Sequence, residues 1–212
     1  SEIGRLNELE VVDSNRIGDR EGLKYLPDGP EGPEVHTPEA FKKIYQVVKD
    51  SGYVGATMPT QYGGGGAPFT TAILAGEVGI ASNMAFYMGP GLSHGAMKTI
   101  LKKATEELKD KYLPNMTSGE WMGTMCLTEP QCGTDLGLIK TTAKPVDNHY
   151  ELNGQKIWIS FGEHDLTENI IHLVLARTPD APAGIKGISL FLVPKRLDNL
   201  SLIHISEPTR LL

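Results

Sequence analysis

The segment Met125–Gly137 combines residue types that could hold a polar ligand. Pro130 would fix a turn, and Gly133 would let the backbone approach a bound group closely. The hydroxyls of Thr128 and Thr134, together with the backbone N–H groups of such a loop, could grip a polar heterocycle or a phosphate. The residues by themselves leave a second interpretation open, in which the segment is a tight structural turn.

The glycine run Gly63–Gly66 invites comparison with phosphate-binding loops but matches neither of their patterns. It lacks the lysine and the hydroxyl residue that end the nucleotide-binding loop. It also does not follow a predicted strand and open a helix with the dinucleotide-binding spacing. We therefore interpret it as a loop between helices and expect no Rossmann crossover.

Two carboxylates flank one imidazole at Glu163, His164 and Asp165, which could suggest metal binding or acid–base chemistry. No second histidine stands at ligand spacing, because His172 is too distant for a helical i, i+4 pair. The sequence therefore predicts no metal site. A loop that hydrogen-bonds its own backbone and holds the strands in place is the simpler interpretation.

The composition argues against several classes of function. The formal net charge is −6, and no basic stripe carries interleaved aromatic residues, so nucleic acid is not an expected partner. No apolar run approaches the roughly 20 residues that cross a bilayer. Cys126 and Cys132 are too few for a disulfide framework and wrongly spaced for zinc, which indicates reduced thiols in a cytoplasmic protein.

The first half of the chain has helical patterns. Phe41, Ile44, Tyr45 and Val48 fall on one helical face, with Thr37 as the expected N-cap and Gly52 as the expected stop. Further helices are expected over Thr70–Gly79, over Ala81–Ala96 with a break near Pro90-Gly91, and from the cap Thr105 to a stop at Pro114.

After Gly119 the apolar pattern changes to a period of two. Strands are expected at Trp121–Leu127, Ile170–Ala176 and Gly187–Val193. Asn153-Gly154 predicts the turn of a hairpin that joins Tyr150–Leu152 to Lys156–Ser160. Helices followed by strands indicate an α+β fold, with a helical domain over 1–117 and an incomplete antiparallel β-domain over 118–196.

Three segments, in this order, resemble the signatures of the acyl-CoA dehydrogenases, a family of flavoenzymes. They are Met125-Cys126-Leu127-Thr128-Glu129-Pro130-Gln131-Cys132-Gly133-Thr134-Asp135, Leu152-Asn153-Gly154-Gln155-Lys156-Ile157-Trp158-Ile159-Ser160 and Ile188-Ser189-Leu190-Phe191-Leu192-Val193-Pro194. The resemblance covers roughly Gly18 to Pro194. The sequence in Gly162–Asn169, Met84–Phe86 and Pro90–Ala96 is closer to the larger bacterial branch of the family, whose members resemble 3-methylmercaptopropionyl-CoA dehydrogenase.

The resemblance implies FAD as cofactor. The backbone around Leu127 and Thr128 would bond the pyrimidine edge of the flavin, Trp158 would cover the face away from substrate, and Ser160 would reach the N5/O4 edge. Met125 stands where relatives often carry an aromatic residue. The implied cofactor-binding set is Met125, Leu127, Thr128, Gly133, Thr134, Trp158, Ile159 and Ser160, and Thr134 would also bind substrate at the start of the acyl-CoA channel.

The resemblance also implies a reaction, in which an α-proton leaves an acyl-CoA thioester and a β-hydride passes to flavin N5. Family members take the proton with a glutamate of a C-terminal helical domain, and no segment here matches it. Glu129 and Glu163 belong to motifs whose family roles are structural, so no catalytic residue is assigned. The implied partners are acyl-CoA, an electron-transfer flavoprotein and, in the full-length protein, further copies of the chain.

The two ends of the chain depart from the family pattern. Residues 197–212 read like a non-native tail, similar to translated sequencing-adaptor sequence, and the family has further helices upstream of residue 1. We therefore expect an incomplete, inactive piece of a dehydrogenase that binds FAD weakly, if at all. The alternative is a non-catalytic module that binds flavin or acyl-CoA, and an acyl-CoA oxidase parent also stays open.

Overall fold

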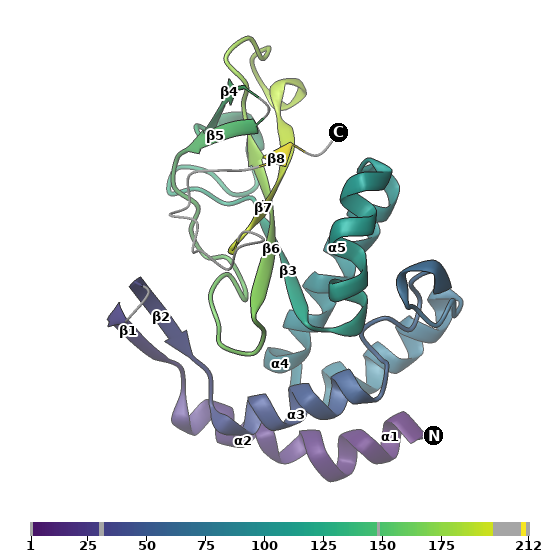
Figure 1. Ribbon diagram of the computed structural model, residues 1–212. Coiled ribbons are helices and arrows are strands. Elements are labelled where there is room, and N and C mark those ends of the chain that lie inside the picture. Colours follow the sequence, from purple (N-terminus) through teal and green to yellow (C-terminus); the bar gives the residue numbers. More distant parts are fainter. Residues whose placement is uncertain (1, 30–31, 148, 197–208, 211–212) are drawn as a thin grey trace.

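The computed structural model describes residues 2–29, 32–147, 149–196 and 209–210. The first part is mainly helical and the second mainly strands, which confirms the predicted α+β class (Figure 1). The helices are α1 (Glu2–Leu6), η1 (Asn7–Val11), α2 (Val12–Glu21), α3 (Glu39–Asp50), η2 (Thr60–Tyr62), α4 (Phe69–Lys103), α5 (Glu106–Ser118), η3 (Leu136–Leu138) and η4 (Ile185–Gly187). The strands are β1 (Lys24–Gly29), β2 (Gly32–His36), β3 (Trp121–Cys126), β4 (Thr142–Val146), β5 (His149–Asn153), β6 (Asn169–Ala176), β7 (Ser189–Pro194) and β8 (Thr209–Arg210).

The main sheet has the strand order β3-β6-β7-β8 and is mixed. β6 and β7 run antiparallel, as do β7 and β8, but β3 and β6 run parallel. The expected antiparallel pairing is therefore found for β6, β7 and β8 but not between β3 and β6. The reason is the connection: a long crossover that contains the β4–β5 hairpin returns the chain to the end of the sheet from which β3 starts.

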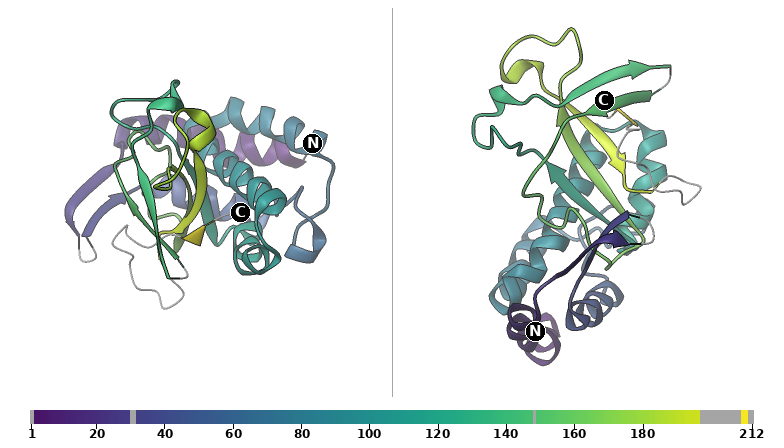
Figure 2. Two further views of the ribbon diagram at one scale, coloured as in Figure 1. Left: turned by 90° about the horizontal axis from the view of Figure 1, so that it is seen from above. Right: turned by 90° about the vertical axis from the view of Figure 1, so that its left-hand side faces the viewer.

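Each face of the sheet packs against a different layer. Leu173 and Leu192 face the helices and join the larger core, which also contains Phe86, Met97 and Leu113. The opposite face carries a smaller core, to which Cys126, Val174, Phe191 and Val193 contribute. α4 and α5 lie along one side of the sheet, while the β4–β5 hairpin lies at the end remote from α2 and α3 (Figures 1 and 2).

Helix α3 confirms the predicted apolar stripe but not its cap. Phe41, Ile44, Tyr45 and Val48 are all buried in the larger core. Thr37 does not cap the helix, because its hydroxyl donates to the carboxylate of Asp165 instead, at 2.7 Å. A contact between residues distant in sequence thus outcompetes the local one.

The long helix α4 bends at Asn83 and not near Pro90, where we expected a break. Asn83 has non-helical backbone angles (φ −157°, ψ 90°). Its side-chain oxygen accepts from the N–H of Phe86 at 3.0 Å, and its amide donates to Ser14 at 2.8 Å. Asn83 therefore caps the second half of α4, and the amide-to-hydroxyl bond ties the bend to α2.

By length and composition α4 could cross a membrane, which the sequence had not led us to expect. Phe86, Met97 and Ile100 of this helix are nevertheless fully buried in the larger core. Apolar side chains in the first half of the helix, among them Ile73, Leu74 and Ile80, are exposed.

Helix α5 begins as predicted and ends later than predicted. Thr105 is the N-cap, and its hydroxyl accepts from the N–H of Leu108 at 3.4 Å. Pro114 lies inside the helix, so the predicted stop there is wrong. The helix ends at Ser118, where Gly119 adopts the left-handed conformation (φ 82°) that favours glycine at a helix terminus.

The hairpin predicted around Asn153-Gly154 is also wrong. β5 pairs with β4, and Lys156–Ser160 is not a strand. The hairpin turns near Asp147, whose φ is 48°. Gly154 serves a close approach instead, since a Cβ at this position would collide with the hydroxyl oxygen of Thr141.

The β1–β2 hairpin was not predicted, because the first part was expected to be helical throughout. The proposed non-native tail, 197–212, lies outside the described residues apart from Thr209 and Arg210. These two residues pair with Leu192 and Phe191 at the edge of the main sheet.

Candidate functional site

The carboxylate of Glu129 is the centre of the loop that follows β3. Glu129 is only 3% exposed and accepts five hydrogen bonds. Their donors are Gln131 Nε2 (2.5 Å), Lys140 N (2.7 Å), Thr141 N (3.1 Å), Thr141 Oγ1 (2.5 Å) and Lys156 Nζ (2.7 Å). Burial by itself raises the pKa of Glu129, but the bonds from Lys156, Thr141 and the two backbone N–H groups outweigh it and lower the pKa to about 2.

Lys156 connects the two sequence motifs that precede and follow the β4–β5 hairpin. Besides its ion pair with Glu129, the ammonium donates to the carbonyl oxygen of Leu127 at 3.2 Å. The next residue, Ile157, donates its backbone N–H to the carbonyl oxygen of Thr128 at 3.0 Å. The end of β3 and the segment from Lys156 to Ser160 are therefore side by side, although about thirty positions separate them.

Trp158 has an unusual conformation for a bulky residue. Its φ is 57°, in the left-handed region that costs most residues on the order of 1–2 kcal/mol. Its side chain is 86% exposed although it is a large aromatic group. A strained backbone that presents an unpacked indole ring is the kind of feature that clusters at ligand sites.

Phe161, three residues later, also has a positive φ, of 54°. Its ring lies against Gly89 of α4, where a Cβ would come within 2.6 Å of the ring. This contact anchors the loop that carries Trp158 to the helical part. Sequence reasoning missed Phe161, for which no local signal existed.

Several residues predicted to bind the cofactor have polar groups that are available to a bound heterocycle. The hydroxyls of Thr128, Thr134 and Ser160 have no hydrogen-bond partner among the described residues. Gly133 is open, since a Cβ at this position would have a methyl carbon of Thr128 as its nearest neighbour, at 3.8 Å. The chain itself thus does not require glycine there, and the space is available to a ligand. These residues fit a flavin.

The structure brings the predicted residues together only in part. Leu127 and Thr128 meet the segment of Trp158–Ser160 through the bonds of Lys156 and Ile157. A cavity of about 460 Å³ next to this segment is lined by Trp158 and Ile159, together with Cys126, Lys156 and His172. The other predicted residues do not line it; they are Met125, Leu127, Thr128, Gly133, Thr134 and Ser160.

The buried Cys126 and the half-buried His172 form a small cluster beside this cavity. Nδ1 of His172 lies 2.7 Å from the hydroxyl of Thr124 and 3.7 Å from the sulfur of Cys126. Burial, followed by the charge of Lys195, lowers the pKa of His172 to about 4. Burial raises the pKa of the Cys126 thiol. Both groups are therefore neutral at pH 7, and this pair is not an activated nucleophile.

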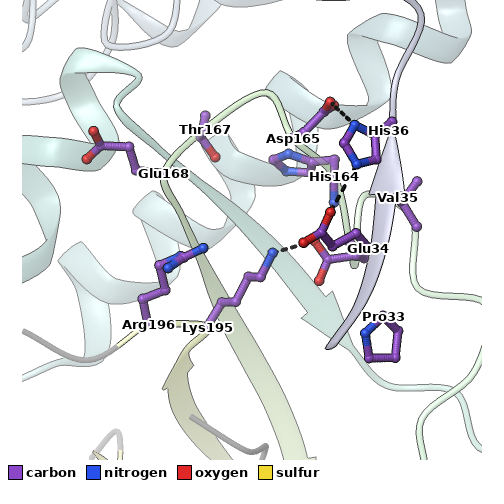
Figure 3. Close-up of a pocket in the computed structure, with 11 residues that line it drawn as sticks. Pro33, Glu34, Val35, His36, His164, Asp165, Thr167, Glu168, Lys195 and Arg196 are labelled. Carbon is purple, nitrogen blue, oxygen red and sulfur yellow. Dashed lines mark hydrogen bonds and ion pairs between the residues drawn. The ribbon is translucent and has the colours of Figure 1, made fainter. Parts of the chain in front are cut away.

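Asp165 is the second carboxylate that organises the chain (Figure 3). It accepts from both the backbone N–H and the hydroxyl of Thr37, at 2.9 and 2.7 Å, and lies 2.8 Å from Lys42 Nζ and 3.3 Å from His36 Nδ1. Burial raises the pKa of Asp165, but the bonds from Lys42 and Thr37 outweigh it and the net shift is downward. Asp165 thus ties the loop before β6 to the start of α3.

The predicted loop role of Glu163-His164-Asp165 is confirmed in its backbone bonds. Glu163 accepts from the N–H of His164 at 3.0 Å, and Nδ1 of His164 accepts from the N–H of Leu166 at 3.2 Å. Glu163 also pairs with Lys195 at the end of β7. Burial, then the charge of Lys195, lowers the pKa of His164 to about 4. The three residues line a cavity of about 350 Å³, shown in Figure 3.

Lys156 and Thr141 were missed as organising residues by sequence reasoning. Lys156 belongs to one of the two family motifs and Glu129 to the other. Their opposite charges were the only signal in the sequence that the two residues could pair. Thr141 carried no signal, because its contact with Glu129 depends on how the chain folds after η3. Among the described residues, no group of three His, Cys, Asp or Glu side chains could hold a metal ion.

Comparison with known proteins gives two consecutive matches. Residues 30–120 match the N-terminal domain of the acyl-CoA dehydrogenases, and residues 124–209 match their middle domain. The 3-methylmercaptopropionyl-CoA dehydrogenase of Ruegeria pomeroyi is 42% identical over 197 residues, which are 92% of this chain and 33% of that protein. A butyryl-CoA dehydrogenase of Syntrophomonas wolfei is 40% identical over 86% of this chain and 30% of its own length.

Solved structures agree. The glutaryl-coenzyme A dehydrogenase in its glutaryl-CoA complex superposes with a TM-score of 0.70 at 27% identity, over 91% of this chain and 44% of that one. The chain spans about a third of the length of the curated relatives it matches. Both domain matches, the identity to the curated relatives and the shared fold lead to one conclusion: the chain belongs to the acyl-CoA dehydrogenase family.

Proposed function

We propose that this chain is part of a flavin-dependent acyl-CoA dehydrogenase, with FAD as cofactor and an acyl-CoA thioester as substrate. The observation that carries the proposal is the junction of two family motifs by Lys156 and Ile157. It places an exposed, strained Trp158 next to a loop with unpartnered hydroxyl groups. The names of the similar proteins support the substrate class.

Each predicted residue has a role in this proposal. The peptide groups of Leu127 and Thr128 bind the pyrimidine edge of the flavin, and Ser160 donates its hydroxyl to the N5/O4 edge. The indole of Trp158 covers the flavin face away from substrate. The remaining contacts are Met125 and Ile159 beside the ring system and Gly133 and Thr134 near the pyrophosphate, with Thr134 also at the entrance for acyl-CoA.

FAD, when bound, would accept the β-hydride of the substrate. The residues of this chain orient the cofactor and exclude water from one of its faces. None of them is proposed as the base that removes the α-proton. Glu129 is ineligible, because a carboxylate with five donors and a pKa of about 2 binds a proton poorly at neutral pH.

The proposal extends to the surroundings of the enzyme. We infer a cytoplasmic protein of fatty acid metabolism that passes its electrons to an electron-transfer flavoprotein. We also infer that the full-length protein is a homo-oligomer. The formal net charge of −6 argues against nucleic acid as a partner.

A second function is supported by the exclusion of Glu129 as a base. The residues that would hold flavin or acyl-CoA do not themselves turn it over, which is the behaviour of a binding module. The two functions differ in one prediction, since only a dehydrogenase is reduced by its own acyl-CoA substrate.

The test begins with the source DNA, read outward from the codon for Pro194, and continues with protein from the complete reading frame. A visible flavin spectrum that acyl-CoA bleaches without oxygen supports the dehydrogenase. A flavin spectrum that short-chain, medium-chain and long-chain acyl-CoA all leave unchanged supports the binding module. Protein without flavin, even after incubation with excess FAD, rejects the dehydrogenase. It rejects the binding module as well if the protein also fails to bind acyl-CoA.

A further inference from the structure

One peptide unit links the proposed flavin site to a buried cation. The carbonyl oxygen of Leu127 accepts from Lys156 Nζ at 3.2 Å. The same peptide unit carries the N–H of Thr128, which has no acceptor among the described residues. The ammonium therefore acts on one end of a peptide whose other end is available to a ligand.

Burial shields the contact between the Lys156 ammonium and the Leu127 carbonyl from competition by water. The side chain of Lys156 is 11% exposed and that of Glu129 is 2% exposed, so water competes little for either charge. Glu129 holds the ammonium at 2.7 Å and is itself held by Thr141 and the backbone of Lys140. The position of Nζ relative to Leu127 is thus determined by a network that the chain completes without a ligand.

The neighbouring peptide units are also held by hydrogen bonds. Thr128 offers its carbonyl oxygen to the N–H of Ile157, and Glu129 exchanges both backbone bonds with Cys132 at 2.8 and 3.0 Å. The Leu127–Thr128 peptide therefore has little freedom to rotate. Hydrogen bonds in a chain polarise one another, and a cation at the carbonyl strengthens the N–H as a donor.

We propose that Lys156 is a positioning residue, whose ammonium orients and polarises the Leu127–Thr128 peptide so that the Thr128 N–H donates to the flavin. This assignment rests on the proposed function. Lys156 does not touch the flavin in it; the residue acts through Leu127. A purely structural Lys156 would affect folding but leave the strength of this donor unchanged.

Three variants test the assignment in protein from the complete reading frame. Lys156→Met removes the charge and keeps most of the length of the side chain, and Lys156→Arg keeps the charge. Lys144→Met is the matched control, because Lys144 is an exposed lysine on β4 and loses the same charge. For each, FAD affinity is measured by quenching of flavin fluorescence, the flavin band by absorption, and folding by thermal melting.

We expect Lys156→Met to bind FAD roughly tenfold more weakly or worse, as loss of a charge-assisted contact predicts. We also expect its flavin band to shift and the amide proton of Thr128 to move upfield in NMR spectra of the FAD-free protein. Lys156→Arg should recover most of the affinity, and Lys144→Met should equal wild type. The amide measurement needs no cofactor and stays informative if binding is weak.

Distinct results separate the failure of this assignment from failure of the proposed function. Wild-type protein that takes up no FAD overturns the proposed function and the assignment with it. Wild-type protein that binds FAD, together with a Lys156→Met variant of equal affinity and spectrum, overturns the assignment alone. Lys156→Met could fail to fold. In that case the contradicting result is a Lys156→Arg variant that folds, and so keeps the charge, but no longer binds FAD.

Discussion

Two carboxylates, Glu129 and Asp165, join distant segments of this chain, and their surroundings differ. Glu129 lies within the strand-rich part and is 3% exposed, and its carboxylate accepts five hydrogen bonds. Asp165 joins the strand-rich part to α3, and its side chain is 23% exposed. Water can stabilise Asp165 when a partner is lost, but it cannot reach Glu129 in the same way. We therefore expect Glu129, the more deeply buried carboxylate, to contribute more to stability than Asp165.

The largest effect is expected for Glu129→Ala. The substitution leaves the ammonium of Lys156 buried without its counter-charge, which typically costs about 3–5 kcal/mol. The free energy of unfolding from urea titration measures the loss. Glu151→Ala, at an exposed carboxylate on β5, is the control and should change it little. A loss below about 1 kcal/mol for Glu129→Ala would remove the distinction between the two carboxylates.

The second effect is a dependence of the unfolding free energy on pH. Because the pKa of Glu129 is lowered from 4.5 to about 2 in the folded chain, its contribution is present above pH 4.5 and is lost as the pH falls toward 2. The shift corresponds to about 3 kcal/mol at neutral pH. The difference in unfolding free energy between wild type and Glu129→Gln should shrink steadily from pH 5 downward. A difference independent of pH would show that the charge of Glu129 is not the source.

A smaller loss is expected for Asp165→Ala. Two bonds from Thr37 disappear and leave its N–H without a partner, for a cost of about 1–2 kcal/mol. Urea titration at low and high salt tests this, with Asp180→Ala in an exposed loop as the control. A loss equal to that of Glu129→Ala would mean that the partial exposure of Asp165 does not weaken its contribution.

The smallest effect is expected for Lys42→Met. Its ammonium lies 2.8 Å from Asp165, but both side chains are partly exposed, and such pairs contribute about 0.2–1 kcal/mol. A double-mutant cycle with Asp165→Ala isolates the pairwise energy. A coupling energy of several kcal/mol would indicate that this pair resembles the buried pair of Lys156 and Glu129.

Local patterns in the sequence were enough to predict several helices and strands correctly. The stripe of α3 and the strand Trp121–Cys126 follow from their apolar periods, and the cap at Thr105 follows from its residue type. The motif around Thr128 and that around Trp158 were also found, because their residues are contiguous. Their roles toward FAD remain proposals.

Predictions failed where a distant contact outweighed a local preference. Asn153-Gly154 reads as a hairpin turn, yet Gly154 is needed where the chain passes close to Thr141. Thr37 reads as a helix cap, yet Asp165 binds its hydroxyl. The bend of α4 lies at Asn83 because Ser14 is placed to bond it.

The sequence by itself determined the family resemblance, the α+β class and the elements whose signals lie within ten or so residues. Only the tertiary structure decided that β3 and β6 run parallel, that Lys156 meets both Glu129 and Leu127, and that Asp165 reaches α3. The physical reason is the range of the interactions. Periodicity and capping depend on neighbours along the chain, whereas ion pairs and strand order depend on which segments the packed core brings into contact.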